Sequence, residues 1–370
     1  MTSKKIIVSG GGTAGHIYPI LEVVRLLKKR HKNYEILYVG SKSHIEEKII
    51  DAKIPFKSIP AGKLHRALTL KHFPQAFNAI KGLLQAKKIV KEFQPDLVFV
   101  KGGFVSLPIM LAAFNQKVPI IAHESDVVMG LSNKIGLKIA SKICVSYPKK
   151  YYKNIDKNKM IFTGLPIRQD FFAAPQKNDR QIFNIKKDLP VLLITGGSQG
   201  STAINKAIEP LIPYLAGRIQ IIHLTGQENE KQFIKIKKSL SREVASHYHP
   251  YGFLDKGMET AVKISDLAIS RSGSTIAELA AARVPMILIP LPTAAGDHQT
   301  QNAEIYAKEG AAITIKQSHL TPERLRDIIY AVLDDKQRII GMKAAAKRMT
   351  IRDAADRVVR VIEETLNSEK

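Results

Sequence analysis

The feature that most constrains the fold of this chain is an alternation of short, continuously apolar runs with segments of helical pattern. The runs lie at 6–8, 36–39, 97–100, 119–122 and 143–145 in the first half, and at 191–194, 219–222, 267–269 and 286–289 in the second. Continuous β-branched runs, unlike alternating ones, are typical of parallel strands whose two faces are both covered by helices. The sequence therefore predicts an α/β protein built on parallel sheets.

This pattern restarts near the middle of the chain. The run at 6–8 leads into Gly10, Gly11 and Gly12, and the run at 191–194 leads into Gly196 and Gly197. A polar stretch without a clear period, 171–187, separates the halves, and 370 residues is an ordinary length for two domains. We therefore expect two Rossmann-like domains, 1–163 and 164–340, facing each other across a cleft. A last helical segment, 341–370, is a candidate to pack back on the first domain.

The chain is strongly basic, with 57 Lys and Arg against 33 Asp and Glu and a formal net charge of +24. Such a charge implies an anionic partner: nucleic acid, an anionic membrane face or phosphorylated substrates. Cys144 is the single cysteine, which excludes an internal disulfide and a cysteine-based metal site and is typical of a reducing cytosol. The apolar run at the N-terminus, 6–8, is far shorter than that of a signal peptide, and no stretch of the sequence approaches the length of a bilayer span. We therefore expect an intracellular protein that is soluble or peripherally bound to a membrane.

Four loops share one design, in which a predicted buried strand leads into a glycine-containing turn and then into a helical segment. They lie at 10–16, 102–106, 196–200 and 271–275. Glycine lets the backbone turn sharply and approach a ligand, and a helix N-terminus offers N–H groups to a phosphate. Open α/β sheets bind ligands at the carboxyl ends of their strands. Four such loops, divided between two domains, favour a ligand that carries a diphosphate.

The first loop also matches the dinucleotide fingerprint Gly-x-Gly-x-x-Gly, through Gly10, Gly12 and Gly15. That fingerprint requires an acidic residue about 20 positions further on, at the end of the second strand. The second strand ends instead at Val39-Gly40-Ser41, so the sequence disfavours a dehydrogenase.

Polar side chains near the loops indicate the chemistry. A neutral imidazole at His16 can accept a proton from a hydroxyl, or it can hold a phosphate. The carboxylate of Glu278, one turn into a helical segment, can bind two sugar hydroxyls or complement the helix dipole. Gln299 supplies an amide that both donates and accepts, and Arg168, at the predicted domain junction, is a candidate phosphate clamp.

Taken in order, these motifs resemble the bacterial MurG family, the UDP-N-acetylglucosamine–N-acetylmuramyl-(pentapeptide) pyrophosphoryl-undecaprenol N-acetylglucosamine transferases. The matching stretches are 11–19, 102–106, 123–130 with 133–134, 163–168, 196–200, 271–278, and 297–299 with 302–303. The resemblance implies a glycosyltransferase B fold and an inverting transfer that needs no metal or other cofactor. GlcNAc would move from UDP-GlcNAc to the 4-hydroxyl of the MurNAc-pentapeptide of lipid I, giving β-1,4-linked lipid II for peptidoglycan, on which cell shape and division depend.

The resemblance also implies partners and a location. Lipid I is the acceptor, an anionic membrane surface is a partner, and the enzyme is peripheral at the cytoplasmic face of the plasma membrane. Other cell-wall synthesis proteins are further candidate partners, and nucleic acid is not expected.

Site residues follow from the resemblance position by position. The donor set is Thr13, Ala14, Gly15, Asp126, Arg168, Ser198, Leu254, Ser274, Thr275, Glu278 and Gln299. Within it, Ser198 and Arg168 match phosphate contacts, Glu278 matches the ribose ligand, and the backbone of Leu254 matches the position that reads uracil. The loops for the acceptor pyrophosphate are formed by Gly11, Gly12, Thr13, Gly102, Gly103 and Ser106. His16 matches the base that deprotonates the acceptor hydroxyl, and no residue matches a metal ligand.

The chain departs from the family pattern in two places. Ser125-Asp126 stands where many relatives have Gln-Asn. An ionised Asp accepts hydrogen bonds but does not donate them, so its contact with GlcNAc must differ, and Asp126 competes with His16 for the role of base. Gly273 and Glu278 are also one residue closer than in most relatives, which leaves the individual roles of Ser274 and Thr275 open.

Part of the positive charge is concentrated at 52–91, where nine basic residues and no acidic ones occur: Lys53, Lys57, Lys63, Arg66, Lys71, Lys81, Lys87, Lys88 and Lys91. In the same stretch Phe73, Phe77, Ile80 and Leu84 share one helical face. This face either packs on the sheet or, ringed by lysines, contacts a membrane. We prefer the membrane, through a patch of Leu64, Leu68, Phe73 and Phe77 with Lys63, Arg66, Lys71 and Lys81.

Two alternatives stay open. A basic nucleic-acid-binding protein would explain the charge but none of the glycine loops, and the sequence carries no nucleic-acid motif. Another nucleotide-sugar enzyme of the same fold, an epimerase or a lipid glycosyltransferase with a different acceptor, would explain the loops and is separated by its choice of acceptor.

Overall fold

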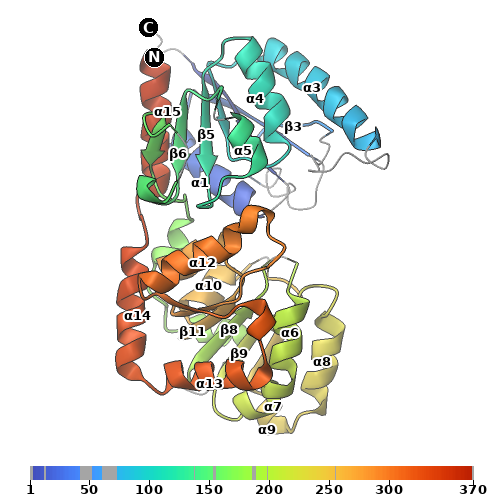
Figure 1. The fold of residues 1–370 in the computed structure, drawn as a ribbon, viewed down its shortest axis with the longest axis vertical. Helices are drawn as coiled ribbons and strands as arrows, with labels where there is room; N and C mark the ends of the chain where they lie inside the picture. Colours follow the sequence, from blue (N-terminus) through green and yellow to red (C-terminus); the bar gives the residue numbers. More distant parts are fainter. Residues whose placement is uncertain are drawn as a thin grey trace. The chain divides into compact units, whose positions relative to one another are not determined.

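The computed structural model describes residues 3–11, 14–41, 52–60, 73–136, 138–152, 156–185, 189–197, 199–254 and 256–368, with the backbone alone at 14, 73–77, 131 and 132. The chain divides into two compact units (Figure 1). Unit 1 is Met1–Arg168 with Asp353–Lys370, and unit 2 is Gln169–Arg352. The sequence predicted the first division between 163 and 164 and the second between 340 and 341, so both lie later in the chain than predicted.

The described part of unit 1 holds a seven-stranded sheet in which every pairing is parallel. In sheet order the strands are β3 (Phe56–Ser58), β2 (Glu35–Gly40), β1 (Lys5–Ser9), β4 (Leu97–Val100), β5 (Ile120–Glu124), β6 (Lys142–Val145) and β7 (Met160–Phe162). Its helices are α1 (Ala14–Arg30), α3 (Phe73–Phe93), α4 (Ser106–Asn115), α5 (Leu131–Gly136) and α15 (Ala354–Ser368), with a 3-10 turn η3 (Lys149–Tyr151).

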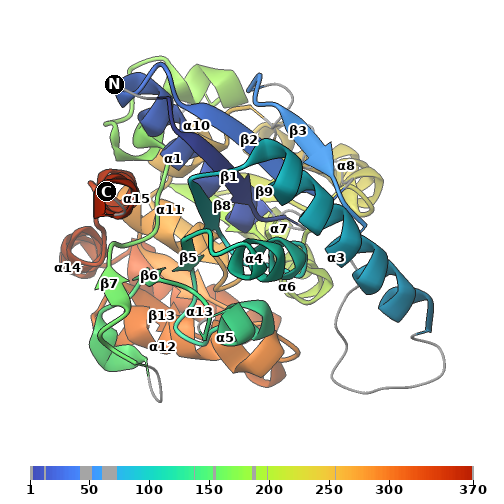
Figure 2. The ribbon, with the colours of Figure 1, turned by 90° about the horizontal axis from the view of Figure 1, so that it is seen from above.

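Helices α1 and α15 cover one face of this sheet, side by side in both views (Figures 1 and 2). Apolar residues recur along α1 at helical spacing, and Ile20 and Leu27 are buried against the sheet. Val8 of β1 packs with Ile20 and with Ile362 of α15. The C-terminal helix is thus part of the core of unit 1, although the whole length of unit 2 separates it from that unit in sequence.

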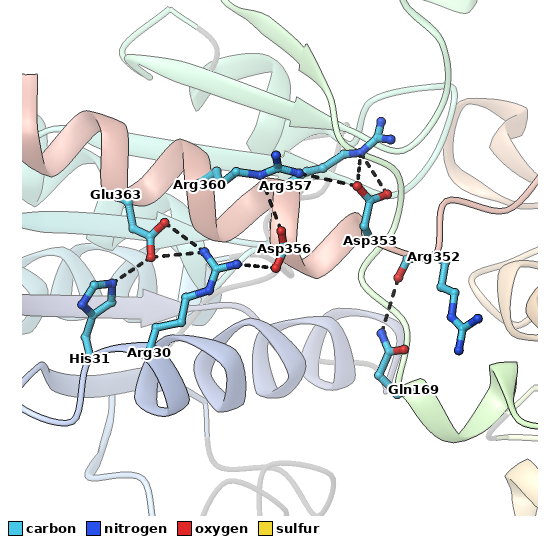
Figure 3. A network of polar contacts seen from close by, with 9 residues as sticks. All are labelled: Arg30, His31, Gln169, Arg352, Asp353, Asp356, Arg357, Arg360 and Glu363. Atoms are coloured by element: carbon cyan, nitrogen blue, oxygen red, sulfur yellow. Dashed lines mark hydrogen bonds and ion pairs between the residues drawn. The ribbon is translucent and has the colours of Figure 1, made fainter.

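Charged side chains also join α15 to α1 (Figure 3). Arg30 near the end of α1 contacts Asp356 and, at 3.0 Å, Glu363 of α15, and the Nε2 of His31 lies 2.7 Å from an oxygen of Glu363. Pairs at the surface contribute little individually, so the apolar face of α15 carries most of the packing energy. Within unit 2, the side chain of Gln169 donates to the carbonyl of Arg352 at 3.4 Å, which places the two ends of this unit next to each other.

The described part of unit 2 holds a six-stranded sheet that is likewise parallel in every pairing. In sheet order its strands are β10 (Tyr248–Tyr251), β9 (Gln220–Leu224), β8 (Val191–Thr195), β11 (Leu267–Ser270), β12 (Met286–Leu288) and β13 (Ala312–Thr314). Its helices are α6 (Thr202–Ile208), α7 (Ile212–Leu215), α8 (Glu230–Ser239), α9 (Arg242–Ala245), α10 (Met258–Lys263), α11 (Thr275–Ala281), α12 (His298–Lys308), α13 (Pro322–Leu333) and α14 (Lys336–Arg348). Short 3-10 turns are η4 (Gln169–Phe172), η5 (Asp179–Phe183), η6 (Glu209–Leu211), η7 (Ala295–Asp297) and η8 (Gln317–His319).

The core of unit 2 is built from the same two ingredients, strand residues and amphipathic helices. Ile194 of β8 is buried with Ile208 of α6 and Ile329 of α13. Helix α14 packs against α13 and α11 and belongs to unit 2. The predicted segment 341–370 is therefore divided, because only its part from Asp353 onward lies in unit 1.

Each of the nine predicted strands is present, and the prediction of parallel α/β sheets is confirmed. The strands that the sequence did not predict are β3, β7, β10 and β13, which are the outermost strands of the two sheets. Edge strands are shorter and only partly buried, so they lack a continuous apolar run. Strand β10 even contains Pro250, a residue that a central strand would not tolerate because it has no N–H for the ladder.

Candidate active site

Both sheets reverse their strand order next to their first strand, which is the position where open α/β sheets bind ligands. In unit 1 the reversal lies between β1 and β4, and in unit 2 it lies between β8 and β11. The four predicted glycine loops are the segments that follow these four strands. The topology therefore gives each unit one switch point that is flanked by two of the loops.

In unit 1 the two loops touch. The Nδ1 of His16 lies 2.9 Å from the carbonyl oxygen of Gly11. Gly103 has a positive φ of 82°, and a Cβ at this residue would lie 2.9 Å from the same oxygen and 3.4 Å from the His16 ring. Glycine is thus required at 103 by its backbone conformation and by the close approach of the first loop. Predicted residues Gly11, His16 and Gly103 are brought together.

The second loop is supported from below by a buried serine. The hydroxyl of Ser106, at the start of α4, donates to the carbonyl of Gly102 at 2.6 Å and lies 3.3 Å from that of Ser9. Because this hydroxyl is directed into the protein, the structure gives Ser106 a supporting position under the loop. The Ser106 hydroxyl is therefore engaged by these two carbonyls.

The loop after β5 is organised by Glu124. One carboxylate oxygen accepts the backbone N–H of Asp126 at 3.0 Å. The other accepts the backbone N–H of Gly130 at 3.1 Å and the amide of Asn133 at 2.8 Å. Three donors satisfy this buried carboxylate, and they fix the backbone on both sides of the half-buried Asp126.

A buried lysine, Lys101, lies between these loops. It follows β4 directly, is 1% exposed, and donates from its Nζ to the hydroxyl of Ser125. Burial lowers the pKa of Lys101 to about 8, against the opposite effect of the Glu124 and Asp126 carboxylates. Burial raises the pKa of Glu124, and the charge of Asp126 raises it further. The pKa of the neighbouring His123 is lowered well below its usual value, first by burial and then by Lys101.

Arg168 is the last residue of unit 1, and its guanidinium lies 4.9 Å from the ring centroid of Tyr18 on α1. Stacking on an aromatic face holds a guanidinium without neutralising its charge. The cation is therefore positioned by the helix that follows the first glycine loop, within unit 1 and not within the predicted donor domain.

In unit 2 the loop after β8 is tightly packed against its neighbour. Thr195 accepts the backbone N–H of Gly197 at 3.2 Å, and Ser201 caps α6 by accepting the N–H of Ile204. Gly200 has a φ of 75°, and a Cβ there would lie 2.5 Å from the carbonyl of Thr225. The described ends of the loop are thus closely packed, whereas an added Cβ at Gly197 would meet nothing within 4 Å, so the backbone there is open to a ligand.

The loop after β11 carries the other polar candidates of unit 2. Arg271 is buried and donates to the carbonyls of Ile289 and Pro290 and to the side chain of Gln317. Because these three acceptors engage the guanidinium, Arg271 has a structural role and holds the loop to the segments that carry them. Ser274 stands at the N-cap position of α11 with no capping hydrogen bond from its side chain, and Thr275 begins the helix. Both are half-buried, together with Glu278 in the first turn.

Gln299 is tied to this loop by two contacts. Its backbone carbonyl accepts the hydroxyl of Ser272 at 2.7 Å, and its side-chain oxygen accepts the backbone N–H of Leu291 at 2.9 Å. The amide nitrogen is the part of this side chain that is left to donate to a ligand hydroxyl. Leu254 is half-buried after β10, and Glu230 holds the adjacent Gly252 through its backbone N–H at 2.9 Å.

Several predicted residues lie outside the described part of the chain. Among the loop residues these are Gly12, Thr13 and Ser198. Ala14 and Gly15, by contrast, are described and form the start of α1. In the predicted membrane patch, Lys63, Leu64, Arg66, Leu68 and Lys71 are outside the description, as are the side chains of Phe73 and Phe77.

The described part of α3 presents apolar side chains to solvent. Ile80 and Leu84 are each 62% exposed, with Lys81, Lys87 and Lys91 exposed on the same helix. Two of the basic residues counted above, Lys57 and Lys88, pair with Glu92, which follows the acid-free stretch directly. Among the described residues, no helix has the length and apolarity to cross a membrane, and no three His, Cys, Asp or Glu side chains form a group able to hold a metal.

Sequence analysis assigned no role to Lys101 or to Tyr38, whose hydroxyl contacts the carbonyl of Gly10. It placed Asn133 in a stretch that carries the resemblance but gave this residue no role either. A signal was present for Lys101, because a lysine that stands directly between a buried strand and a glycine pair has no obvious access to solvent. The structural roles of Asn133 and Tyr38 could not be predicted in this way, since they depend on elements that approach only in the fold.

Comparison with known proteins agrees with this geometry. The glycosyltransferase family 28 N-terminal domain matches residues 6–145, and the glycosyltransferase family 28 C-terminal domain matches residues 191–358. A UDP-N-acetylglucosamine–N-acetylmuramyl-(pentapeptide) pyrophosphoryl-undecaprenol N-acetylglucosamine transferase from Lachnoclostridium phytofermentans is 38% identical over 365 residues, which cover 98% of this chain and 99% of the relative.

Among solved structures, Acinetobacter baumannii MurG aligns with a TM-score of 0.72 at 26% identity over 98% of this chain and 99% of its own. A UDP-GlcNAc 2-epimerase from Neisseria meningitidis aligns with a TM-score of 0.69 at 14% identity over 99% of this chain and 100% of its own, and so shares the fold alone. The chain therefore belongs to the family of UDP-N-acetylglucosamine–N-acetylmuramyl-(pentapeptide) pyrophosphoryl-undecaprenol N-acetylglucosamine transferases.

Proposed function

We propose that this protein is a hexosyltransferase that moves GlcNAc from UDP-GlcNAc to the 4-hydroxyl of the MurNAc-pentapeptide of lipid I and so produces lipid II for peptidoglycan. The observation that carries the proposal is the nearly full-length similarity to a transferase of this name. It is supported by a glycine-lined switch point in each unit, as a reaction between two pyrophosphate-bearing substrates requires.

Unit 2 is the proposed donor side. The open backbone at Gly197, with Ser198 beside it, would receive the diphosphate, since loop N–H groups bind anionic oxygens. Glu278 would accept two ribose hydroxyls, the backbone near Leu254 would read uracil, and the amide nitrogen of Gln299 would donate to the sugar. Ser274 and Thr275 lie in the same loop, and their individual roles stay open.

Unit 1 is the proposed acceptor side. Its loops at Gly11, Gly12 and Thr13 and at Gly102-Gly103 would bind the acceptor pyrophosphate. Thr13, Ala14 and Gly15 match the family's loop between that group and the donor sugar. Arg168, held on Tyr18, would supply positive charge to the donor phosphates.

His16 is the first candidate for the base. A carbonyl only accepts hydrogen bonds, so the Nδ1 that faces Gly11 carries the proton in the neutral ring. The acceptor lone pair is then on Nε2, which is the atom suited to take a proton from a hydroxyl. Asp126 is the second candidate, because its carboxylate also accepts a proton.

The reaction balances without a further reactant. The 4-hydroxyl oxygen attacks C1 of GlcNAc from the face opposite UDP, and the C1–O bond to UDP breaks as the new bond forms. The base takes the hydroxyl proton, and UDP leaves with the bonding electrons. Loop N–H groups and Arg168 would stabilise the charge that develops on UDP, which is why we propose that no metal is needed.

We further propose that the protein docks on an anionic membrane through α3. Exposed Ile80 and Leu84, flanked by exposed lysines, have the composition of a peripheral contact, in which apolar side chains insert and lysines meet anionic headgroups. This patch would keep the acceptor side near a lipid-linked substrate. Phe73 and Phe77 precede it on the same helix and belong to the proposal through their sequence spacing alone.

The test is to supply UDP-GlcNAc and a lipid I analogue to the protein, with EDTA in one series and Mg²⁺ in another. We expect a β-1,4-linked disaccharide lipid at similar rates in both series. Binding of UDP-GlcNAc without any disaccharide would overturn the acceptor assignment, and conversion of UDP-GlcNAc to its epimer would favour the epimerase. Product only with Mg²⁺ would overturn the metal-free route.

A further inference from the structure

Lys101 is a buried cation at the switch point of unit 1 that the proposed mechanism does not use. Its backbone N–H donates to the carbonyl of Ser9 at 2.8 Å, so the residue is fixed to β1 as well as to its own strand. A Cβ added to Gly10 would lie 3.1 Å from the Cβ of Lys101. The first glycine loop therefore rests on the stem of this lysine.

A buried ammonium is costly unless charges and hydrogen bonds surround it. Here the Nζ donates to the hydroxyl of Ser125, and the carboxylates of Glu124 and Asp126 act on it electrostatically. Two further titratable groups near it are Cys144 on β6 and His123 on β5. The charge of Lys101 favours the neutral form of His123. One cation thus faces a segment of three residues, 124–126, that carries two carboxylates.

The same segment is held from its other side by hydrogen bonds. The carboxylate oxygens of Glu124 accept hydrogen bonds from the N–H groups of Asp126 and Gly130 and from the amide of Asn133. Those bonds fix the backbone of the loop, and Lys101 fixes the hydroxyl between its two acids. The lysine is therefore the counter-charge of this loop as well as one of its anchors.

We propose that Lys101 is a positioning residue for the proposed sugar-contacting loop 124–126, where its ammonium holds Ser125 and supplies the counter-charge to the carboxylates of Glu124 and Asp126. The inference rests on the proposed function, because it concerns the rate of GlcNAc transfer. It adds to that function a buried group that touches neither substrate and acts through Ser125 and Asp126.

A merely structural lysine and a positioning lysine differ in their response to alkaline pH. The pKa of Lys101 is lowered from 10.5 to about 8, so between these values the unfolded chain binds the proton that the folded chain has lost. Stability rises with pH wherever the unfolded state binds more protons, so the contribution of Lys101 to the free energy of unfolding increases over this window. Transfer activity is expected to fall in the same window, because the ammonium disappears from the loop.

The experiment measures kcat/KM for GlcNAc transfer to a lipid I analogue from pH 6 to 10, in the wild type and in Lys101→Arg, Lys101→Met, Asp126→Asn and the double variant Lys101→Met with Asp126→Asn. We expect an alkaline limb near pH 8 in the wild type that moves upward in Lys101→Arg, which stays charged. We expect Lys101→Met to lower kcat/KM about 10- to 100-fold. The double variant should have a kcat/KM no lower than that of the less active single variant. Circular dichroism spectra identify any variant that does not fold.

Two results overturn the inference while the function stands. One is an alkaline fall of kcat/KM that stays at the same pH in Lys101→Arg. The other is a double variant whose fold-loss of kcat/KM equals the product of the losses in the two single variants. If Lys101→Arg does not fold, the multiplication test decides, and if Lys101→Met does not fold, the limb decides. If neither folds, a wild-type profile that is flat from pH 7 to 9 overturns the inference and a fall near pH 8 supports it. A wild type that binds UDP-GlcNAc but forms no product overturns the function and the inference together.

Discussion

The two switch points share a topology but differ in what lies beneath their loops. In unit 1 the loops rest on buried ionisable groups, Lys101 and Glu124, with His16 against Gly11. In unit 2 the loops rest on hydroxyls, amides and backbone carbonyls, and the buried Arg271 donates to three acceptors within the unit. The loops of unit 1 thus rest on buried charged groups beside a proton acceptor, whereas the described loop residues of unit 2 rest mainly on hydrogen bonds with neutral groups. The difference is that expected when one unit activates a hydroxyl and the other holds a nucleotide.

The largest effect that separates the two units is expected at His16. His16→Ala should lower kcat for transfer by about 10²- to 10⁴-fold, because a positioned base contributes that much. The affinity for UDP, measured by calorimetry, should stay within twofold. His319→Ala, at an exposed histidine of unit 2, is the control and should leave both quantities unchanged. An unchanged kcat in His16→Ala would transfer the role of base to Asp126.

The next effect is expected on the donor side. Glu278→Gln removes a charged acceptor of two ribose hydroxyls, and hydrogen bonds to charged groups are worth about 1.5–3 kcal/mol. The KM for UDP-GlcNAc should therefore rise about 10- to 100-fold, with a smaller change in kcat. Glu304→Gln, on the exposed surface of α12, makes the same chemical change away from the loop and should leave KM as it was. If both variants behave alike, Glu278 is not a donor ligand.

A third comparison uses one glycine from each unit. Gly103→Ala places a Cβ 2.9 Å from the Gly11 carbonyl at a φ of 82°, whereas Gly273→Ala meets nothing within 4 Å. Strain of this kind costs about 1–3 kcal/mol, so thermal unfolding of the Gly103 variant should begin several degrees earlier. The Gly273 variant should unfold as the wild type does. Equal midpoints would mean that the two loops of unit 1 do not touch in solution.

The smallest effect concerns the surface of α3. Replacing both Ile80 and Leu84 by Ser should weaken binding to anionic liposomes about 5- to 50-fold, at roughly 1 kcal/mol for each inserted side chain. Ile182 and Ile340 of unit 2 are each 59% exposed and provide a matched double variant that should bind as the wild type. Weaker binding in both double variants would show that any exposed apolar side chain suffices.

The burial of each element determined whether the sequence could predict it. Interior strands such as β1 and β8 carry continuous apolar runs because both of their faces are covered, and these runs were sufficient to find the two sheets and their loops. The edge strands and the return of α15 to unit 1 were missed or only raised as a candidate, since both depend on partners distant in sequence. In the site, Gly103 was found by its motif. The network of Glu124 with Asn133 and the burial of Lys101 arise only when β4, β5 and α5 meet.

The division of roles between the switch points can be measured directly by hydrogen–deuterium exchange of the whole protein with and without UDP. We predict slower exchange of backbone amides at 196–200 and 271–278 in unit 2, and unchanged exchange at 102–106 in unit 1. Slower exchange at 102–106, with none at 196–200 and 271–278, would contradict the assignment of the nucleotide to unit 2.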